Sequence, residues 1–125
     1  MIVLDSSVLI DALRENPLAV RALTDEIDRN GLPSASTVTM FEVWRGLRSH
    51  ERRLARQVFA LVRWVHVDAP TPGLAGELGR RFRRSHPGLD DLDYLIAATT
   101  LRLDGELWTH NIKHFPMLEN LVAPY

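Results

Sequence analysis

A set of acidic and amide side chains stands where predicted strands end or predicted helices begin. Its members are Asp5, Glu42, Asp90, Asp91, Asp93 and Asn111. In a parallel α/β sheet, ligands bind at the carboxyl ends of the strands, so several of these side chains can converge there. Carboxylate and amide oxygens suit hard divalent cations. A cation held by them can lower the pKa of a bound water and stabilise the negative charge that develops when that water attacks a substrate.

Each acid also has a simpler structural explanation. Asp5 follows the apolar residues 2–4 and could cap the next helix or shape a turn. Residues 39–42 match a capping box in which Glu42 would accept a hydrogen bond from the backbone amide of Thr39. Asp90 or Asp91 is expected to cap the helix that follows. Asp93 is harder to explain in this way, because a helix needs only one cap.

The apolar pattern predicts the elements that must position these acids. Strands are expected at residues 2–4, 32–35, 64–67 and 106–109, with 121–123 as a fifth. Helices are expected over 6–13, 17–30, from 39 to about 47, 51–62, 74–82 and 90–103, with 69–73 as a turn. Strands that alternate with helices predict a three-layer α/β/α sandwich around a central parallel sheet of four to five strands.

Composition limits the class of protein. A chain of 125 residues, 46% of them hydrophobic, suits one domain over residues 1–125. The net charge of −1 gives no overall basic signal, although the arginine-rich stretches 45–56 and 80–84 could each contact phosphates or simply be solvated helix faces. Cysteine is absent, there is no signal-peptide pattern, and no apolar run approaches the roughly 20 residues that span a bilayer. We therefore expect a cytoplasmic protein with no membrane segment.

Four segments, in order, resemble the PIN-domain ribonucleases, and among them the VapC toxins of toxin–antitoxin modules. The segments are residues 2–10, the pattern Thr39-x-x-Glu42-x-x-x-Gly46, residues 93–98 and residues 107–115. The resemblance implies a PIN-like fold and an endoribonuclease that hydrolyses RNA with a metal-activated water, leaving 5′-phosphate and 3′-hydroxyl ends. It also implies an RNA substrate, a cognate VapB-like antitoxin whose C-terminal segment covers the acidic groove, and a homodimer.

Matched motif to motif, the resemblance assigns the catalytic acids. Asp5, Glu42 and Asp93 take the three acidic positions, with Mg²⁺ or Mn²⁺ on Asp5 and Asp93. Asn111 takes a fourth position that is often Asp in the wider family, which removes one negative charge and argues against a firmly held second metal. Asp90 is the reserve candidate for a supporting acid.

The remaining polar and aromatic residues have smaller expected roles. Ser7 and Thr109 are expected to donate hydrogen bonds that orient Asp5. The pair His110 and His114 has helical metal spacing, but Pro116 and the preceding strand argue against a zinc site there. The three tryptophans fit the apolar core, with Trp44 a candidate for contact with a partner because it lies near Glu42.

Two other functions remain open on the sequence. A PIN-fold module that binds nucleic acid or protein without cutting would explain Asn111, although three intact acids argue against it. A phosphatase with a phosphoaspartyl intermediate would need a second Asp two residues after Asp5, where the chain has Ser7.

Overall fold

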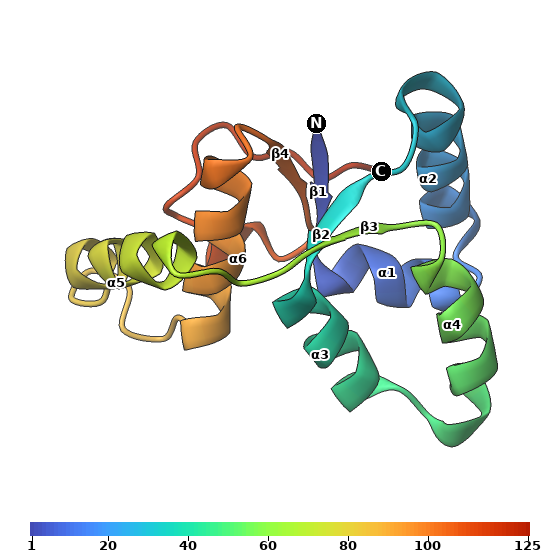
Figure 1. The fold of residues 1–125 in the computed structure, drawn as a ribbon, viewed down its shortest axis with the longest axis horizontal. Helices are drawn as coiled ribbons and strands as arrows, with labels where there is room; N and C mark the ends of the chain where they lie inside the picture. The colour runs from blue at the N-terminus through green and yellow to red at the C-terminus, as the bar shows by residue number, and fades with distance from the viewer.

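Four parallel strands form the centre of the molecule, in the order β3-β2-β1-β4 (Figure 1). A computed structural model describes all residues, 1–125. The strands are β1 (Ile2–Leu4), β2 (Ser34–Ser36), β3 (Arg63–Val65) and β4 (Glu106–Trp108). Leu4 is in register with Trp108 of β4, and Val3 with Ser34 of β2. Because every strand runs the same way, all four carboxyl ends lie at one edge of the sheet.

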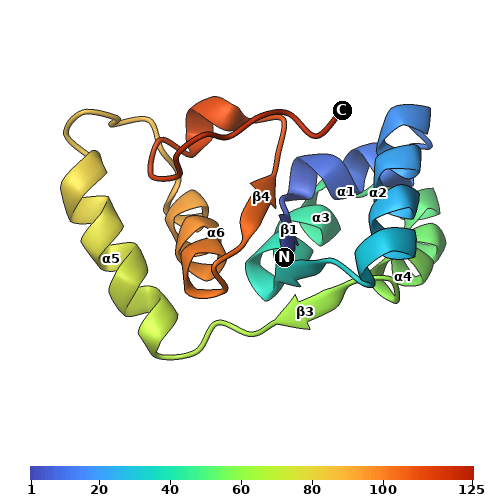
Figure 2. The ribbon, with the colours of Figure 1, turned by 90° about the horizontal axis from the view of Figure 1, so that it is seen from above.

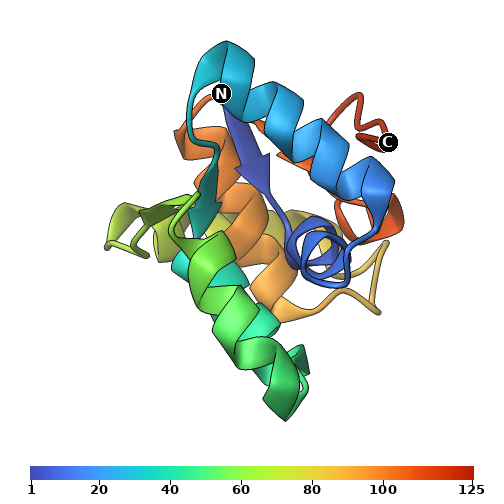
Figure 3. The same ribbon diagram turned by 90° about the vertical axis from the view of Figure 1, so that its right-hand side faces the viewer.

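Helices cover both faces of this sheet. They are α1 (Ser6–Leu13), α2 (Pro17–Asn30), α3 (Thr37–Gly46), α4 (Arg52–Phe59), α5 (Pro70–Phe82) and α6 (Asp91–Arg102), with short 3-10 helices η1 (Ser49–Glu51) and η2 (Ile112–His114). Seen from above, α5 and α6 lie on one side of β1, and α1, α2 and α4 on the other (Figure 2). Seen from the side of α2 and α4, these two helices lie in front of the sheet (Figure 3). The three-layer prediction is confirmed, with four strands in the sheet.

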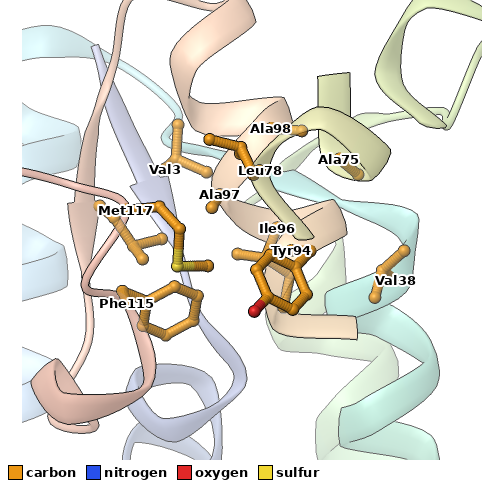
Figure 4. Close-up of a cluster of buried hydrophobic side chains, with 11 residues drawn as sticks. Val3, Val38, Ala75, Leu78, Tyr94, Ile96, Ala97, Ala98, Phe115 and Met117 are labelled. Atoms are coloured by element: carbon orange, nitrogen blue, oxygen red, sulfur yellow. The ribbon is translucent and has the colours of Figure 1, made fainter. Parts of the chain in front are cut away.

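The alternation of side chains along β1 produces two hydrophobic cores. Val3 joins the cluster beneath α5 and α6, which Phe115 and Met117 complete (Figure 4). Leu4 points the other way, into the cluster formed with α1, α2 and α4. Both side chains are fully buried, as expected for a strand covered on two faces.

Two helices begin earlier than the sequence suggested. The Ser36 hydroxyl accepts a 3.0 Å hydrogen bond from the backbone amide of Val38, which caps α3 and starts it at Thr37 rather than near Thr39. Residues 70–73, expected to be a turn, form the first turn of α5. Proline is compatible with the first positions of a helix because the amide that it lacks would have had no helical partner. The turn prediction was therefore wrong.

The strands are also shorter or shifted. Residues 121–123 form no strand, so the fifth strand was wrong. β2 begins after Pro33 rather than at residue 32, and it is an inner strand. Pro33 is tolerated just before the strand, where its carbonyl oxygen accepts a 2.8 Å hydrogen bond from the amide of Arg63. No helix of the structure is both long enough and apolar enough to cross a bilayer.

Candidate active site

Asp5 lies at the carboxyl end of β1, with only 3% of its surface exposed. It occupies the N-cap position of α1, but its side chain makes no capping hydrogen bond. Instead, Oδ2 accepts a 2.7 Å hydrogen bond from the hydroxyl of Thr109 and a 3.2 Å bond from that of Ser7. The capping interpretation of Asp5 is therefore wrong for its side chain, which is directed to the end of β4.

The loop after β4 fixes both hydroxyl donors. The backbone amide of Asn111 donates to Thr109 Oγ1 at 2.9 Å, and that of His110 donates to Ser7 Oγ at 3.2 Å. Each hydroxyl thus accepts from the backbone and donates to Asp5, which leaves it little freedom to turn away. Asn111 itself is exposed, and none of the hydrogen bonds around the acids uses its side-chain amide.

Asp93 lies in the first turn of α6, with 6% of its surface exposed. Its Oδ2 accepts a 3.3 Å hydrogen bond from the backbone amide of Asp90, and the Asp90 side chain accepts from the amide of Leu92 at 3.0 Å. Asp90 is therefore the N-cap of α6, while Asp91 is exposed. Nδ1 of His114 lies 3.4 Å from Asp93 Oδ2.

Burial raises the pKa of Asp93 above its ordinary value. The neighbouring His114 and the backbone amide of Asp90 oppose this rise, and the charge of Asp5 adds to it. Asp93 therefore combines a structural contact to the helix cap with an electrostatic link to Asp5.

Glu42 lies inside α3 rather than at its start. Because Ser36 is the N-cap, the capping box over residues 39–42 does not form, and that interpretation of Glu42 was wrong. The Glu42 side chain is 13% exposed, Oε2 lies 3.9 Å from Nη2 of Arg45, and Oε1 is buried with no hydrogen-bond partner. A buried carboxylate oxygen without a donor calls for a positive or polar ligand.

Glu42 is coupled electrostatically to Asp5 and Asp93. Burial, followed by the charges of Asp5 and Asp93, raises the pKa of Glu42 to about 7, against the opposing effect of Ser6 and Arg45. Like charges that are close together disfavour joint ionisation. The acids of β1, α3 and α6 thus lie near enough for their charges to interact.

These residues fit a partly hydrated hard cation. All the candidate ligands are oxygens, Oε1 of Glu42 is buried without a hydrogen-bond partner, and a divalent ion would relieve the raised pKa values. No three acid or histidine side chains are gathered closely enough to hold an ion by themselves. Mg²⁺ commonly uses one or two carboxylates and keeps several waters, so its binding does not require three acids in contact with it.

The sequence did not predict the contacts that His114 and His110 make. His114 approaches Asp93, and the ring of His110 packs against that of Tyr125 at 4.3 Å, while the Tyr125 hydroxyl donates to Asp11 at 2.8 Å. The two histidines therefore contact different partners. Nothing local in the sequence indicates these pairs, because they depend on how the loop after β4 and the C-terminal segment pass over α1 and α6.

Known proteins resemble this chain over its whole length. A PIN-domain family model matches residues 2–115. The chain is 38% identical to Ribonuclease VapC19 of Mycobacterium tuberculosis over 100% of both proteins, and 38% identical to Ribonuclease VapC10 of the same organism over 100% of this chain and 93% of the relative.

Solved structures share the fold at lower identity. A toxin-antitoxin complex from Klebsiella pneumoniae has a TM-score of 0.82 and 23% identity, covering 100% of this chain and 98% of the other. VapBC2 from Rickettsia felis, bound to a promoter DNA fragment, has a TM-score of 0.77 and 19% identity, covering 98% and 97%.

Proposed function

Since this chain belongs to the PIN-domain family and is a VapC-type ribonuclease toxin, we propose that Asp5, Glu42 and Asp93 form the site at which it hydrolyses RNA. The observation that carries this assignment is the coupling of the three acids, seen in the pKa of Glu42 at about 7 and in its unpartnered Oε1. A purely structural acid would have a hydrogen-bond or ion-pair partner for each buried oxygen. Such a charge cluster is typical of a functional site.

The proposed cofactor is Mg²⁺ or Mn²⁺, held by Asp5 and Asp93. When bound, it would activate a water and stabilise charge on the phosphate. Asp5 can serve as a ligand because Thr109 and Ser7 fix its orientation through Oδ2. Glu42, whose pKa burial and the neighbouring acids raise to about 7, can exchange a proton with a water at the same place.

Asp90 and Asn111 have supporting roles in the proposed site. Asp90 holds Asp93 in place through the cap of α6, and Asn111 holds Thr109 through its backbone amide. We propose both as positioning residues. The loss of the fourth acid at position 111 supports one firmly held metal rather than two.

The test is cleavage of single-stranded and structured RNA by the purified protein with Mg²⁺, Mn²⁺ or EDTA. Asp5→Asn, Glu42→Gln and Asp93→Asn should each abolish cleavage, whereas Asp91→Asn, in the same turn as Asp93 but exposed, should retain it. The products should carry 5′-phosphate and 3′-hydroxyl ends. Cleavage that persists in EDTA, or 2′,3′-cyclic phosphate ends, would overturn the assignment.

The alternative is a PIN-fold module that binds nucleic acid or protein without cutting. Only the exposed Asn111 in place of an acid favours it. Calorimetry separates the two: the proposed nuclease should release a heat with Mn²⁺ that is lost in Asp5→Asn, and a pure binding module has no need of such a heat.

A VapB-like antitoxin is the proposed partner, with its C-terminal segment over the acidic groove. The solved relatives of Klebsiella pneumoniae and Rickettsia felis are themselves a toxin-antitoxin complex and a VapBC assembly, which supports this proposal. The cognate antitoxin should inhibit cleavage and protect the protein from thermal unfolding. Inhibition that survives removal of its C-terminal segment would argue against the groove as the contact.

The chain is further proposed to be a single domain, residues 1–125, that forms a homodimer. Both hydrophobic clusters share β1, so they should unfold together. One cooperative transition in urea and the mass of two chains in light scattering are the expected results.

A further inference from the structure

Phe41 and Arg45 lie next to Glu42 on the solvent-facing side of α3. Phe41 is 52% exposed, and the guanidinium of Arg45 lies 5.1 Å from the centre of its ring. The same guanidinium reaches to 3.9 Å from Oε2 of Glu42. One cation therefore contacts both an exposed aromatic ring and an acid of the proposed catalytic site.

Packing of α3 does not require this exposed ring. The opposite side of the helix supplies Thr39 and Val43, both fully buried, to the interior. Trp44, one turn after Phe41, packs edge-on against the ring of Phe59, with the ring centres 5.1 Å apart. Phe41 makes no contact with another aromatic ring, and the guanidinium of Arg45 lies over its ring. Phe41 therefore offers an aromatic face to a ligand beside the proposed catalytic acids.

Arg45 is also free to change partner. Its side chain is 56% exposed, and the 3.9 Å approach to Glu42 is at the outer limit of an ion pair. Such exposed pairs contribute little to stability. The guanidinium can therefore turn to a phosphate without losing a strong interaction, while its plane stays stacked on an aromatic ring.

We propose that Phe41 and Arg45 form a stacking site for a nucleobase next to the scissile phosphate, an inference that rests on the proposed RNA hydrolysis at Asp5, Glu42 and Asp93. The base would stack on the ring of Phe41, and Arg45 would pair with the adjoining phosphate. The chemistry fits a single-stranded ribonucleotide, since every base has a face that can stack on an aromatic ring. The neighbouring guanidinium favours a ligand that carries a phosphate over an uncharged apolar segment.

The test uses the full-length protein with Asp5→Asn, which keeps the RNA uncut, and a short single-stranded oligouridylate that carries one 2-aminopurine. Stacking quenches the fluorescence of this base. Phe41→Leu should remove the quenching and weaken binding about tenfold, and Phe41→Tyr should preserve both. Arg45→Gln should weaken binding more than Arg45→Lys. Lysine loses the planar stack but keeps the charge, whereas glutamine loses the charge as well. Leu18→Ala, at a 60% exposed residue of α2, is the control and should change nothing.

Quenching and affinity that are unchanged in Phe41→Leu would overturn the proposal. A second result would also overturn it: light scattering that shows a monomer for Phe41→Leu while the variant still binds RNA. The ring would then lie between two copies of the chain and not against a base. The readout does not depend on hydrolysis. Failure of the wild-type protein to cut RNA with Mg²⁺ would refute the proposed activity, whereas loss of the quenching difference between Leu and Tyr refutes only the stacking site.

Discussion

The hydroxyl of Thr109 donates a 2.7 Å hydrogen bond to Oδ2 of Asp5, a residue 104 positions earlier in the chain. Both residues are almost completely buried. Leu4 and Trp108, the residues before them, are partners in the parallel pairing of β1 with β4, so the register of the sheet places the two side chains together. Sheet geometry thus determines which oxygen of Asp5 is engaged and leaves Oδ1 for a ligand.

Replacing Thr109 with valine keeps the shape of the side chain but removes this donor. We expect Thr109→Val to weaken Mn²⁺ binding about 10- to 100-fold, because residues that orient a metal ligand typically contribute this much. It should also lower the free energy of unfolding by about 1–3 kcal/mol, since the Asn111 amide loses its acceptor. Calorimetry with Mn²⁺ and urea denaturation measure the two effects. Thr109→Ser keeps the hydroxyl and should behave nearly as wild type; equal Mn²⁺ affinity in Val and Ser variants would exclude an orienting role.

The raised pKa of Glu42 predicts how stability depends on pH without metal. Between its ordinary value of 4.5 and about 7, the folded protein keeps a proton that the unfolded chain releases. The free energy of unfolding should therefore fall as pH rises through this window. One pKa unit corresponds to about 1.4 kcal/mol, and partial solvation of Glu42 reduces the expected total to about 1–2 kcal/mol. The shift of Asp93 acts in the same direction.

Urea denaturation in EDTA, repeated across this pH range, measures the effect. Glu42→Gln should have a shallower slope than wild type and be the more stable of the two near pH 7. The other titratable groups are the same in both proteins, so the difference between the two slopes reports on Glu42. Parallel slopes would show that Glu42 is ionised in the folded state throughout this range.

Sequence periodicity predicted most of the succession of helices and strands along the chain, because apolar runs and proline or glycine breaks are local signals. It located α1 and α2 and placed α6 to within one residue at each end. It misplaced the start of α3, where two serines and two threonines precede Glu42 and each could cap. The error mattered, because a start near Thr39 makes Glu42 a capping residue and a start at Thr37 makes it a buried acid inside the helix. His114 beside Asp93 depends on contacts distant in sequence, which no local pattern records.

Asp90 should act through the cap of α6 rather than on the substrate. Asp90→Ala removes the hydrogen bond to the Leu92 amide and should lower the free energy of unfolding by about 1 kcal/mol. Asp90→Ser restores a capping oxygen and should recover most of this loss. RNA cleavage, measured well below the melting temperature, should persist in both variants because Asp93 remains. Loss of cleavage in the stable Asp90→Ser variant would instead make Asp90 a member of the catalytic set.

Two glycines should respond to alanine in opposite directions. Gly105 precedes β4, and a Cβ there would lie 2.8 Å from Cγ2 of Val3 and 3.1 Å from the carbonyl oxygen of Met1. Gly105→Ala should therefore lower the free energy of unfolding by about 1–3 kcal/mol, because the start of β4 must move away from β1. Gly76 lies inside α5, where a Cβ would meet nothing within 4 Å.

Gly76→Ala should raise the free energy of unfolding by about 0.5–1 kcal/mol, because alanine loses less backbone entropy on forming a helix. Urea denaturation of both variants gives the comparison, and RNA cleavage adds a second measure. A displaced β4 also displaces Thr109 from Asp5, so Gly105→Ala should lose activity at a temperature where it is still folded. Gly76→Ala should keep its activity, because α5 lies on the far side of α6 from β4 (Figure 2). Full activity in a destabilised Gly105→Ala protein would mean that the contact between Thr109 and Asp5 tolerates movement of the strand that carries it.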